Sequence, residues 1–201
     1  MKDIGKKSEI IKWAEILGTK VTSLRLASQF RCNGSDGYLA WIDNLLQIRE
    51  TANDSLEGIN YDFEVIDNPS LLHEKIIELN LKKNKSRLLA GYCWKWISKK
   101  NPNLKDIVIG DYKATWNLNS HGQSWIIHPD SVSEVGCIHT SQWLELDYVG
   151  VIIGPDLIVR DDKIITDVTK RASSDQSVKG IKNRLKENPE EAKKEADIII
   201  K

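Results

Sequence analysis

The residues best suited to chemistry in this chain lie in one short stretch, 136–154. His139, Thr140, Gln142 and Glu145 follow a short apolar run and precede a longer one, 148–153. A histidine and a glutamate that flank a turn can exchange protons or bind a ligand. Connections between buried strands are where α/β proteins place such groups. Spacing alone leaves a purely structural strand–turn–strand as an equally good interpretation.

The elements around this stretch alternate between helical and extended patterns. This order predicts an α/β fold with a mainly parallel sheet flanked by helices on both faces. Continuous apolar character at 88–92 and 148–153 predicts strands that are buried on both faces. The periodicity predicts helices at 8–18, 35–46, 70–81 and 188–201, and strands at 21–26, 63–66, 87–93, 125–127, 135–138 and 148–153.

Two further segments have their own character. Residues 94–124 are rich in Trp, Asn, Gly and Lys, which predicts an irregular insertion with a short hairpin near 106–111. Residues 161–201 predict a charged helical tail, in which Asn188 and Pro189 supply the start of a helix.

Composition limits the class of protein. Hydrophobic residues make up 40% of the chain and charged residues 29%, as in soluble globular proteins. The 29 basic residues equal the 29 acidic ones in number, so the net charge does not indicate a nucleic-acid binder. A zero net charge is still compatible with a local basic face. Cys32, Cys93 and Cys137 are widely spaced, which predicts free thiols, no metal site and a cytoplasmic location. No run is apolar enough to predict a membrane partner.

Several blocks of the sequence resemble a family of motor proteins. Residues 138–149 resemble motif V of superfamily 1 helicases, and Gln29-Phe30-Arg31-Cys32 resembles their motif IV. Longer blocks resemble, in order, the Schlafen-like DNA/RNA helicase domain family, namely 29–39, 90–94, 106–111 and 149–157. The resemblance implies a P-loop ATPase with two RecA-like domains. It implies that residues 1–201 form a single partial domain, the C-terminal RecA-like one.

The resemblance also implies a nucleotide site. Phe30 would stack on adenine, with Gln29 beside it, and Glu145 would accept a hydrogen bond from the ribose. Arg31 would be the catalytic residue, a planar cation that reaches the terminal phosphate. ATP and Mg²⁺ are therefore the implied cofactors of the intact two-domain enzyme. The alternatives are that Phe30 belongs to the core and that Arg31 pairs with a nearby carboxylate.

By the same resemblance, His139 and Thr140 would contact single-stranded DNA or RNA through phosphate or sugar. The alternative for His139 is a structural histidine. Trp143 stands where motif V usually has a glycine, a position that favours positive φ or close approach to a ligand. The indole could distort the turn, block nucleotide or strand, or stack on a base, and we expect it to reduce activity.

The sequence lacks parts that the reaction requires. No Gly-x-x-x-x-Gly-Lys-Ser/Thr loop is present, and the family's late arginine motif would lie beyond residue 201. We therefore expect part of a DNA/RNA helicase or translocase ATPase that needs an N-terminal P-loop domain, in cis or in trans, to hydrolyse ATP. One alternative is a non-catalytic nucleic-acid-binding or regulatory module, with Trp94, Trp96, Trp116 and Trp125 among lysines. Another is a non-functional fragment of a longer reading frame.

Overall fold

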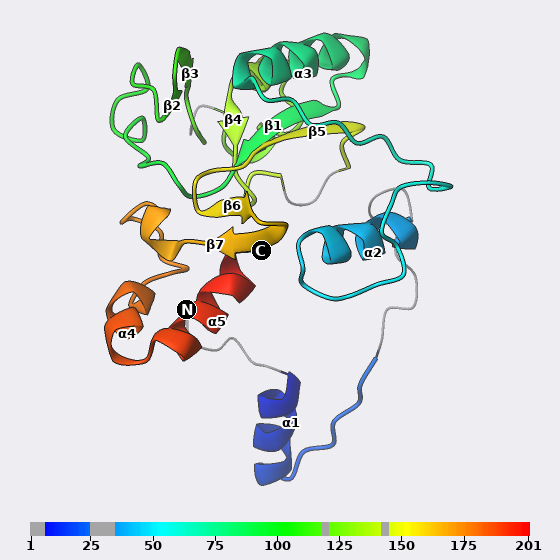
Figure 1. The fold of residues 1–201 in the computed structure, drawn as a ribbon, viewed down its shortest axis with the longest axis vertical. Helices are drawn as coiled ribbons and strands as arrows, with labels where there is room; N and C mark the ends of the chain where they lie inside the picture. The colour runs from blue at the N-terminus through cyan, green and yellow to red at the C-terminus, as the bar shows by residue number, and fades with distance from the viewer. Residues whose placement is uncertain (1–6, 25–34, 118–120, 142–144) are drawn as a thin grey trace. The chain divides into compact units, whose positions relative to one another are not determined.

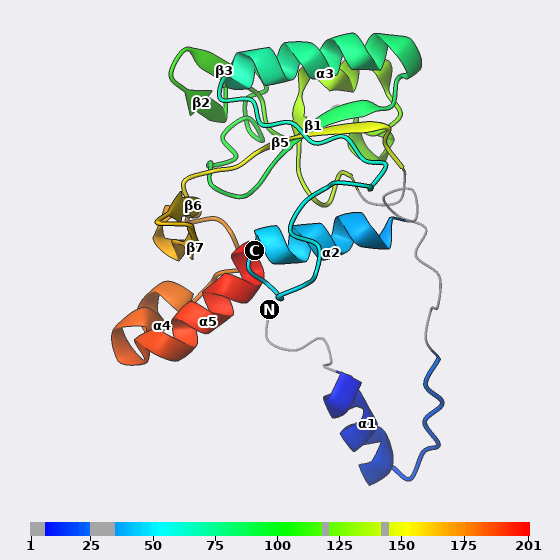
Figure 2. The ribbon, with the colours of Figure 1, turned by 45° about the vertical axis from the view of Figure 1, so that its right-hand side comes forward.

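The computed structural model describes residues 7–24, 35–117, 121–141 and 145–201 of the chain. The chain divides into two compact units, residues 1–61 and 62–201. Figures 1 and 2 show the helices and strands of each unit. The candidate functional residues that the structure describes all lie in the second unit.

The first unit contains two helices, α1 (Lys7–Ile16) and α2 (Asp36–Leu45). Both agree with the predicted helices at 8–18 and 35–46. The Ser35 hydroxyl caps α2 by accepting a hydrogen bond from the Tyr38 backbone N–H, which is the usual role of serine before a first turn. The Tyr38 ring stacks on Tyr61 at 3.7 Å, and Trp41 is buried. Aromatic packing therefore holds the loop after α2 against that helix.

The second unit is built on a small parallel sheet in the order β4-β1-β5. Its strands are β1 (Ser86–Ala90), β4 (Val135–Gly136) and β5 (Tyr148–Ile152). Leu88 in the central strand pairs with Val135 on one side and with Gly150 on the other. The predicted α/β class and the parallel sheet are confirmed. Because β4 and β5 lie on opposite sides of β1, the chain between them must cross the central strand.

Helix α3 (Pro69–Lys83) packs against β1 and β5, as Figure 1 shows. The Asn68 side chain caps its first turn, and Pro69 supplies the fixed φ that suits the first helical position. A Cβ on Gly150 would lie 2.7 Å from Leu88 Cδ1 and 3.0 Å from Ile76 Cγ1. The glycine therefore allows the helix and the central strand to approach each other closely.

The segment 94–124 contains a short antiparallel hairpin and supplies part of the core. Strands β2 (Ile107–Ile109) and β3 (Tyr112–Ala114) form the hairpin, which confirms the one predicted near 106–111. Trp116 forms a parallel bridge to Val135, beside β4. Because Ile107, Ala114 and Trp116 are buried with Leu88, the segment is integrated into the main core.

The C-terminal part forms a second, smaller core. It contains a hairpin, β6 (Leu157–Arg160) with β7 (Lys163–Thr166), and two helices, α4 (Ile181–Glu187) and α5 (Pro189–Ile200). The two helices pack on each other, and α5 also contacts β7 (Figure 2). Asn188 caps α5 and Pro189 begins it, as the sequence predicts. The predicted charged tail, 161–201, therefore does hold a helix at its end, but it also contains strand β7 and helix α4, which the sequence did not predict. The buried residues of this second core are Val168, Val178, Ile181, Ala192 and Ala196.

Four strand predictions are corrected by the structure. Residues 63–66 have no regular structure and Val65 is 77% exposed, since no strand pairs with them among the described residues. Residues 125–127 form a turn after a short 3-10 helix, because a short apolar run does not distinguish strand from buried turn. Residues 21–24 are not a strand, and 25–26 lie outside the described residues. Strand β5 is not buried on both faces: Val149 and Val151 are exposed, because β5 pairs only with β1 among the described strands.

Among the described helices, none combines the length and the apolar content that crossing a bilayer requires.

Candidate functional site at the carboxyl edge of the parallel sheet

Two aromatic side chains meet just beyond the carboxyl ends of neighbouring parallel strands. Tyr92 follows β1 and His139 follows β4, and their ring centroids are 6.2 Å apart in an edge-on arrangement. His139 is exposed and Tyr92 is half-buried. Parallel sheets bind ligands at this edge, because the loops after the strands converge there. The sequence predicted that His139 contacts single-stranded nucleic acid, and the structure places Tyr92 beside it.

Thr140 shapes the turn that presents His139. Its hydroxyl oxygen accepts a 2.8 Å hydrogen bond from the Cys137 backbone N–H, and the hydroxyl donates to the Cys137 carbonyl oxygen at 2.9 Å. The Thr140 backbone N–H also donates to that carbonyl, at 3.1 Å. Side-chain bonds of this kind close a local turn without regular secondary structure. Thr140 therefore fixes the backbone between Cys137 and His139, while its contact with a nucleic acid stays a prediction.

The Tyr92 side chain contacts three residues from different segments of the chain, namely Trp116, Arg171 and Cys137. Its ring packs edge-on against Trp116 at 5.0 Å, and the Arg171 guanidinium lies 5.7 Å from the ring centroid, within the range of a cation–π contact. Its hydroxyl donates to the Cys137 sulfur at 3.9 Å. Burial, with contributions from Cys137, raises the pKa of the Tyr92 phenol well above its usual range. The phenol is therefore a neutral hydrogen-bond donor at physiological pH.

A buried ion network holds the C-terminal segment against the same edge. Arg171 donates to Asp156 at 2.9 Å and to Asp175 at 2.8 Å, and all three side chains are nearly inaccessible to solvent. Burial alone would lower the pKa of Arg171, but hydrogen bonds and charge attraction from the two aspartates outweigh it and raise that pKa. The Ala172 backbone N–H donates to the Tyr92 carbonyl oxygen at 2.8 Å. The ion network and this backbone hydrogen bond therefore hold the segment around Arg171 and Ala172 next to Tyr92.

Glu145 lies at the other end of the sheet. It precedes β5, and two residues later the Asp147 backbone N–H donates to the Lys85 carbonyl oxygen, directly before β1 begins. Glu145 is exposed and lines a hollow with Lys83 and Lys85. A strand of this length spans roughly 13–17 Å at 3.3 Å per residue. The structure therefore brings His139 and Thr140 together but not Glu145 with them.

The remaining predicted contacts lie outside the described residues. These are Gln29, Phe30 and Arg31. Gln142 of the connection after β4, and Trp143, which stands at the glycine position of motif V, also lie outside the described residues. Among the described residues, Glu145 alone belongs to the predicted nucleotide site, and it is exposed. The described residues therefore do not assemble an ATP site by themselves, and we assign no catalytic step to them.

The four tryptophans considered as a single-strand groove have two different roles. Trp116 and Trp125 are buried at 2% and 0% exposure and belong to the interior. Trp94 and Trp96 pack against the core from its border, and the Lys99 ammonium lies 4.8 Å from the Trp96 ring centroid. A groove lined by all four indoles is therefore excluded, because two of them are inaccessible.

Sequence reasoning missed the roles of Tyr92 and Arg171. Tyr92 lies in one of the blocks that resemble the helicase family, but nothing in its neighbours points to His139, which is 47 positions away (139 − 92). Arg171 lies in a charged segment where a solvated surface is the usual interpretation. No group of three or more His, Cys, Asp and Glu side chains that could hold a metal ion occurs within the described residues.

The fold and this edge define an α/β protein whose aromatic and polar side chains gather beyond the ends of a small parallel sheet. The family model described as "Schlafen group 3, DNA/RNA helicase domain" matches residues 1–201, and the chain belongs to this family.

An uncharacterized protein of Saccharomyces cerevisiae is 26% identical to this chain over 148 residues. The match covers 64% of this chain and 31% of the yeast protein, so the chain spans about a third of that relative. No solved structure matches the chain significantly.

Proposed function

We propose that this chain is a C-terminal RecA-like motor portion of a DNA/RNA helicase or translocase ATPase. In this role it contacts single-stranded DNA or RNA and does not hydrolyse ATP by itself. The observation that carries the proposal is the position of His139, which lies exposed beyond a parallel strand and against Tyr92. Membership in a DNA/RNA helicase domain family supports the choice of ligand.

The chemistry of this edge suits a strand that is held without reading its sequence. His139 and Tyr92 offer aromatic surface on which a base or sugar can pack, and every base has a face for such contact. Arg171 is engaged by two carboxylates, so it holds Tyr92 in place rather than contacting phosphate. Thr140 keeps the turn closed, so His139 is presented from a fixed backbone.

Nucleotide contacts are part of the same proposal. By the family resemblance, Gln29, Phe30, Arg31 and Glu145 would each contact the nucleotide in the intact two-domain enzyme. The phosphate loop and the Mg²⁺ site would come from a P-loop domain, in cis or in trans. When bound, ATP with Mg²⁺ would supply the phosphoryl group whose transfer drives strand movement. Because the 201 residues lack a P-loop, we expect the purified chain to show negligible ATPase activity. Robust turnover that is abolished by Arg31→Ala would contradict this expectation.

Strand binding is the direct test. The purified chain should bind a fluorescein-labelled oligo-dT or oligo-U, measured by anisotropy at low salt. His139→Ala should weaken binding by about fivefold or more, on the order of 1 kcal/mol, because it removes aromatic contact with the strand. Asn103→Ala, an exposed change elsewhere in the same unit, should leave the affinity unchanged. Absence of binding at low salt, or equal effects of the two variants, would reject the proposal.

The second candidate is a non-catalytic module that only binds or regulates. The exposed lysine over Trp96 favours it, since a cation on an aromatic face is a common feature of single-strand grooves. The two candidates differ when a P-loop domain of the same family is added. A motor portion should then gain strand-stimulated ATPase activity, whereas a binding module should not.

A further inference from the structure

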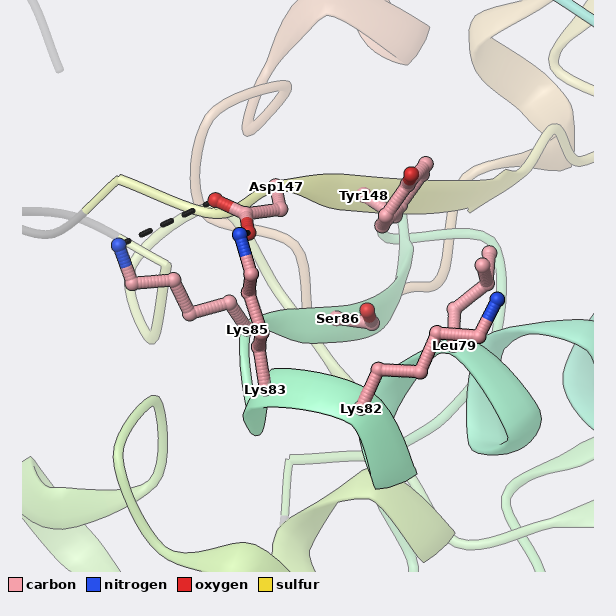
Figure 3. Close-up of a pocket in the computed structure, with 7 residues that line it drawn as sticks. All are labelled: Leu79, Lys82, Lys83, Lys85, Ser86, Asp147 and Tyr148. Carbon is pink, nitrogen blue, oxygen red and sulfur yellow. Dashed lines mark ion pairs between the residues drawn. The ribbon is translucent and has the colours of Figure 1, made fainter.

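A cluster of lysines lies at the amino end of the parallel sheet, opposite to the edge that carries His139. Helix α3 ends at Lys83, Asn84 adopts a left-handed conformation with φ of 48°, and β1 begins at Ser86. Lys82, Lys83 and Lys85 are all exposed. We refer to residues 82–85 as the basic turn, and Figure 3 shows its lysines with their neighbours.

The backbone of the basic turn is held firmly. The Asn84 backbone N–H donates to the Asn80 carbonyl oxygen at 2.7 Å, and the Asn84 side chain donates to the Ile127 carbonyl oxygen at 2.7 Å. The Ser86 backbone N–H donates to the Asn80 side chain at 3.1 Å. The lysines therefore project from a fixed turn, so a partner that binds them does not have to order the backbone first.

The positive charge of the turn is only weakly neutralised. The Lys83 and Lys85 ammonium groups lie 3.7 Å and 3.9 Å from the Asp147 carboxylate, beyond ordinary hydrogen-bond distance. Figure 3 shows both lysines reaching toward Asp147 while the Lys82 ammonium points away from it. Exposed pairs of this kind contribute little stability. Lys82 makes no ion pair within the described residues.

A fourth cation lies behind the turn. Arg87 is wholly buried, and its guanidinium donates only to uncharged oxygens, which are those of Asn80, Asn84, Ser86 and His128. None of its partners among the described residues is a carboxylate, and its Nε has no partner there. Burial lowers the pKa of Arg87 from its usual value. A charge fixed in low-dielectric surroundings adds to the field of the lysines in front of it.

The basic turn borders a hollow that can receive more than a phosphate. Its volume is about 590 Å³, and Lys83 and Lys85 line it together with Ile126, Ile127 and Leu146. Ile127 is 60% exposed, so the apolar wall is accessible. A nucleotide unit offers both parts of a matching ligand, namely an anionic phosphate for the lysines and an apolar face for the wall. Glu145 also lines the hollow, and Asp147 lies beside Lys83 and Lys85, so two carboxylates face three exposed lysines and the buried Arg87.

We propose that the basic turn binds the phosphodiester backbone of a single-stranded nucleic acid, as a second contact surface distinct from the His139 edge. This inference rests on the proposed function for the identity of the partner. A membrane surface fits less well, because lipid-binding clusters usually hold four or more accessible basic residues. Here three lysines are exposed, two of them (Lys83 and Lys85) line the hollow, and Arg87 is buried. Phosphate contacts of this kind position a strand without reading its sequence.

The salt dependence of binding tests the proposal. A triple variant, K82Q/K83Q/K85Q, is compared with K186Q/K193Q/K194Q, which removes the same charge from exposed positions on α4 and α5. Anisotropy titrations with oligo-dT and oligo-U at several salt concentrations give the slope of log K against log salt. Each lost phosphate contact reduces that slope by about 0.7 for single strands. For three lost contacts, the slope of the turn variant should be shallower by about 2, and the slope of the control variant should equal that of the parent chain.

The outcomes separate this inference from the proposed function. An unchanged slope in the turn variant, or an equal loss in the control, overturns the inference while strand binding through His139 still stands. Absence of any binding by the parent chain at low salt overturns both. A further arm uses phosphatidylserine vesicles. If K82Q/K83Q/K85Q loses vesicle binding but keeps the parental salt slope with oligonucleotides, the inference is overturned in favour of a lipid surface. Circular dichroism of each variant shows whether the fold is retained.

Discussion

Arg171 donates a 2.9 Å hydrogen bond to Asp156 and thereby joins the C-terminal segment to the loop after β5. Asp156 lies beyond Ile152, the last residue of β5, and the same guanidinium lies over the ring of Tyr92, which follows β1. One side chain therefore ties together the ends of two parallel strands. This relationship explains why the carboxyl edge of the sheet has a defined shape even though loops build it.

Loss of the Arg171 guanidinium should destabilise the second unit strongly. Arg171→Met leaves Asp156 and Asp175 buried without a cation, and breaking a buried pair in this way costs about 3–5 kcal/mol. Urea denaturation followed by circular dichroism measures the free energy of unfolding. Arg184→Met removes an exposed ion pair between α4 and α5 and should change stability little. Equal effects of the two variants would show that the network does not hold this edge.

A methyl group at Gly154 should not fit. A Cβ at this position would collide with Cys93 Cβ and Sγ and would lie 3.2 Å from an Asp156 carboxylate oxygen. Overpacking of this kind costs about 1–3 kcal/mol, so Gly154→Ala should lower the urea midpoint. Cys93→Ala introduced with it should restore part of the loss, because it removes the sulfur. Gly91→Ala, where the added Cβ would meet Arg171 Nη1 at 3.7 Å, should be tolerated.

Alkaline pH should weaken the fold through Cys93. Burial, followed by its hydrogen bond with Asp156, raises the pKa of the Cys93 thiol from 9.0 to about 12. The folded state therefore keeps a proton that the unfolded state releases, so stability is intact below about pH 9 and falls as pH rises toward 12. Urea midpoints at pH 7.5 and pH 9.8 measure this fall, and Cys93→Ser should reduce it.

Tyr112 provides the comparison for this pH effect. Burial raises the pKa of its phenol from 10.0 to about 12, so its contribution to stability is lost in a higher window, above about pH 10. Tyr112 should therefore contribute little of the loss at pH 9.8. An unchanged fall in Cys93→Ser at that pH would show that the thiol is not the responsible group. Slow labelling of native Cys93 by iodoacetamide at pH 8 is expected for the same reason, because the thiolate is the reactive form.

The ring of Tyr92, more than its hydroxyl, should hold the His139 edge together. Tyr92→Ala removes the contacts with Trp116 and His139 and the cation–π contact with Arg171, at an expected cost of about 2–4 kcal/mol. Tyr92→Phe keeps the ring and loses only a long contact with the Cys137 sulfur, so it should cost less than about 1 kcal/mol. Thermal unfolding compares the two variants, and similar losses would show that the hydroxyl matters more than the ring.

Local signals predicted four of the five α-helices in the described residues, and they missed α4 (Ile181–Glu187), which has no capping side chain before it. Ser35, Asn68 and Asn188 each stand before a helix in the sequence, and each caps one in the structure. The apolar run at 88–92 predicted the central strand, which the structure places at Ser86–Ala90. The predicted strands at 63–66 and 125–127 failed, because a short apolar run does not reveal whether a partner strand exists. Burial at β5 was overestimated for a related reason, since the apolar run at 148–153 does not show that β5 pairs only with β1 among the described strands.

The sequence by itself determined the α/β class, the main helices, the parallel sheet and a family resemblance that the family match confirms. These features depend on local caps, on apolar periodicity and on motifs of consecutive residues. Only the tertiary structure placed Tyr92 beside His139, paired Arg171 with Asp156, and set Glu145 and the basic turn at the opposite end of the sheet. These relationships join residues far apart in the chain through the order β4-β1-β5, and hydrophobic patterning carries no information about strand order.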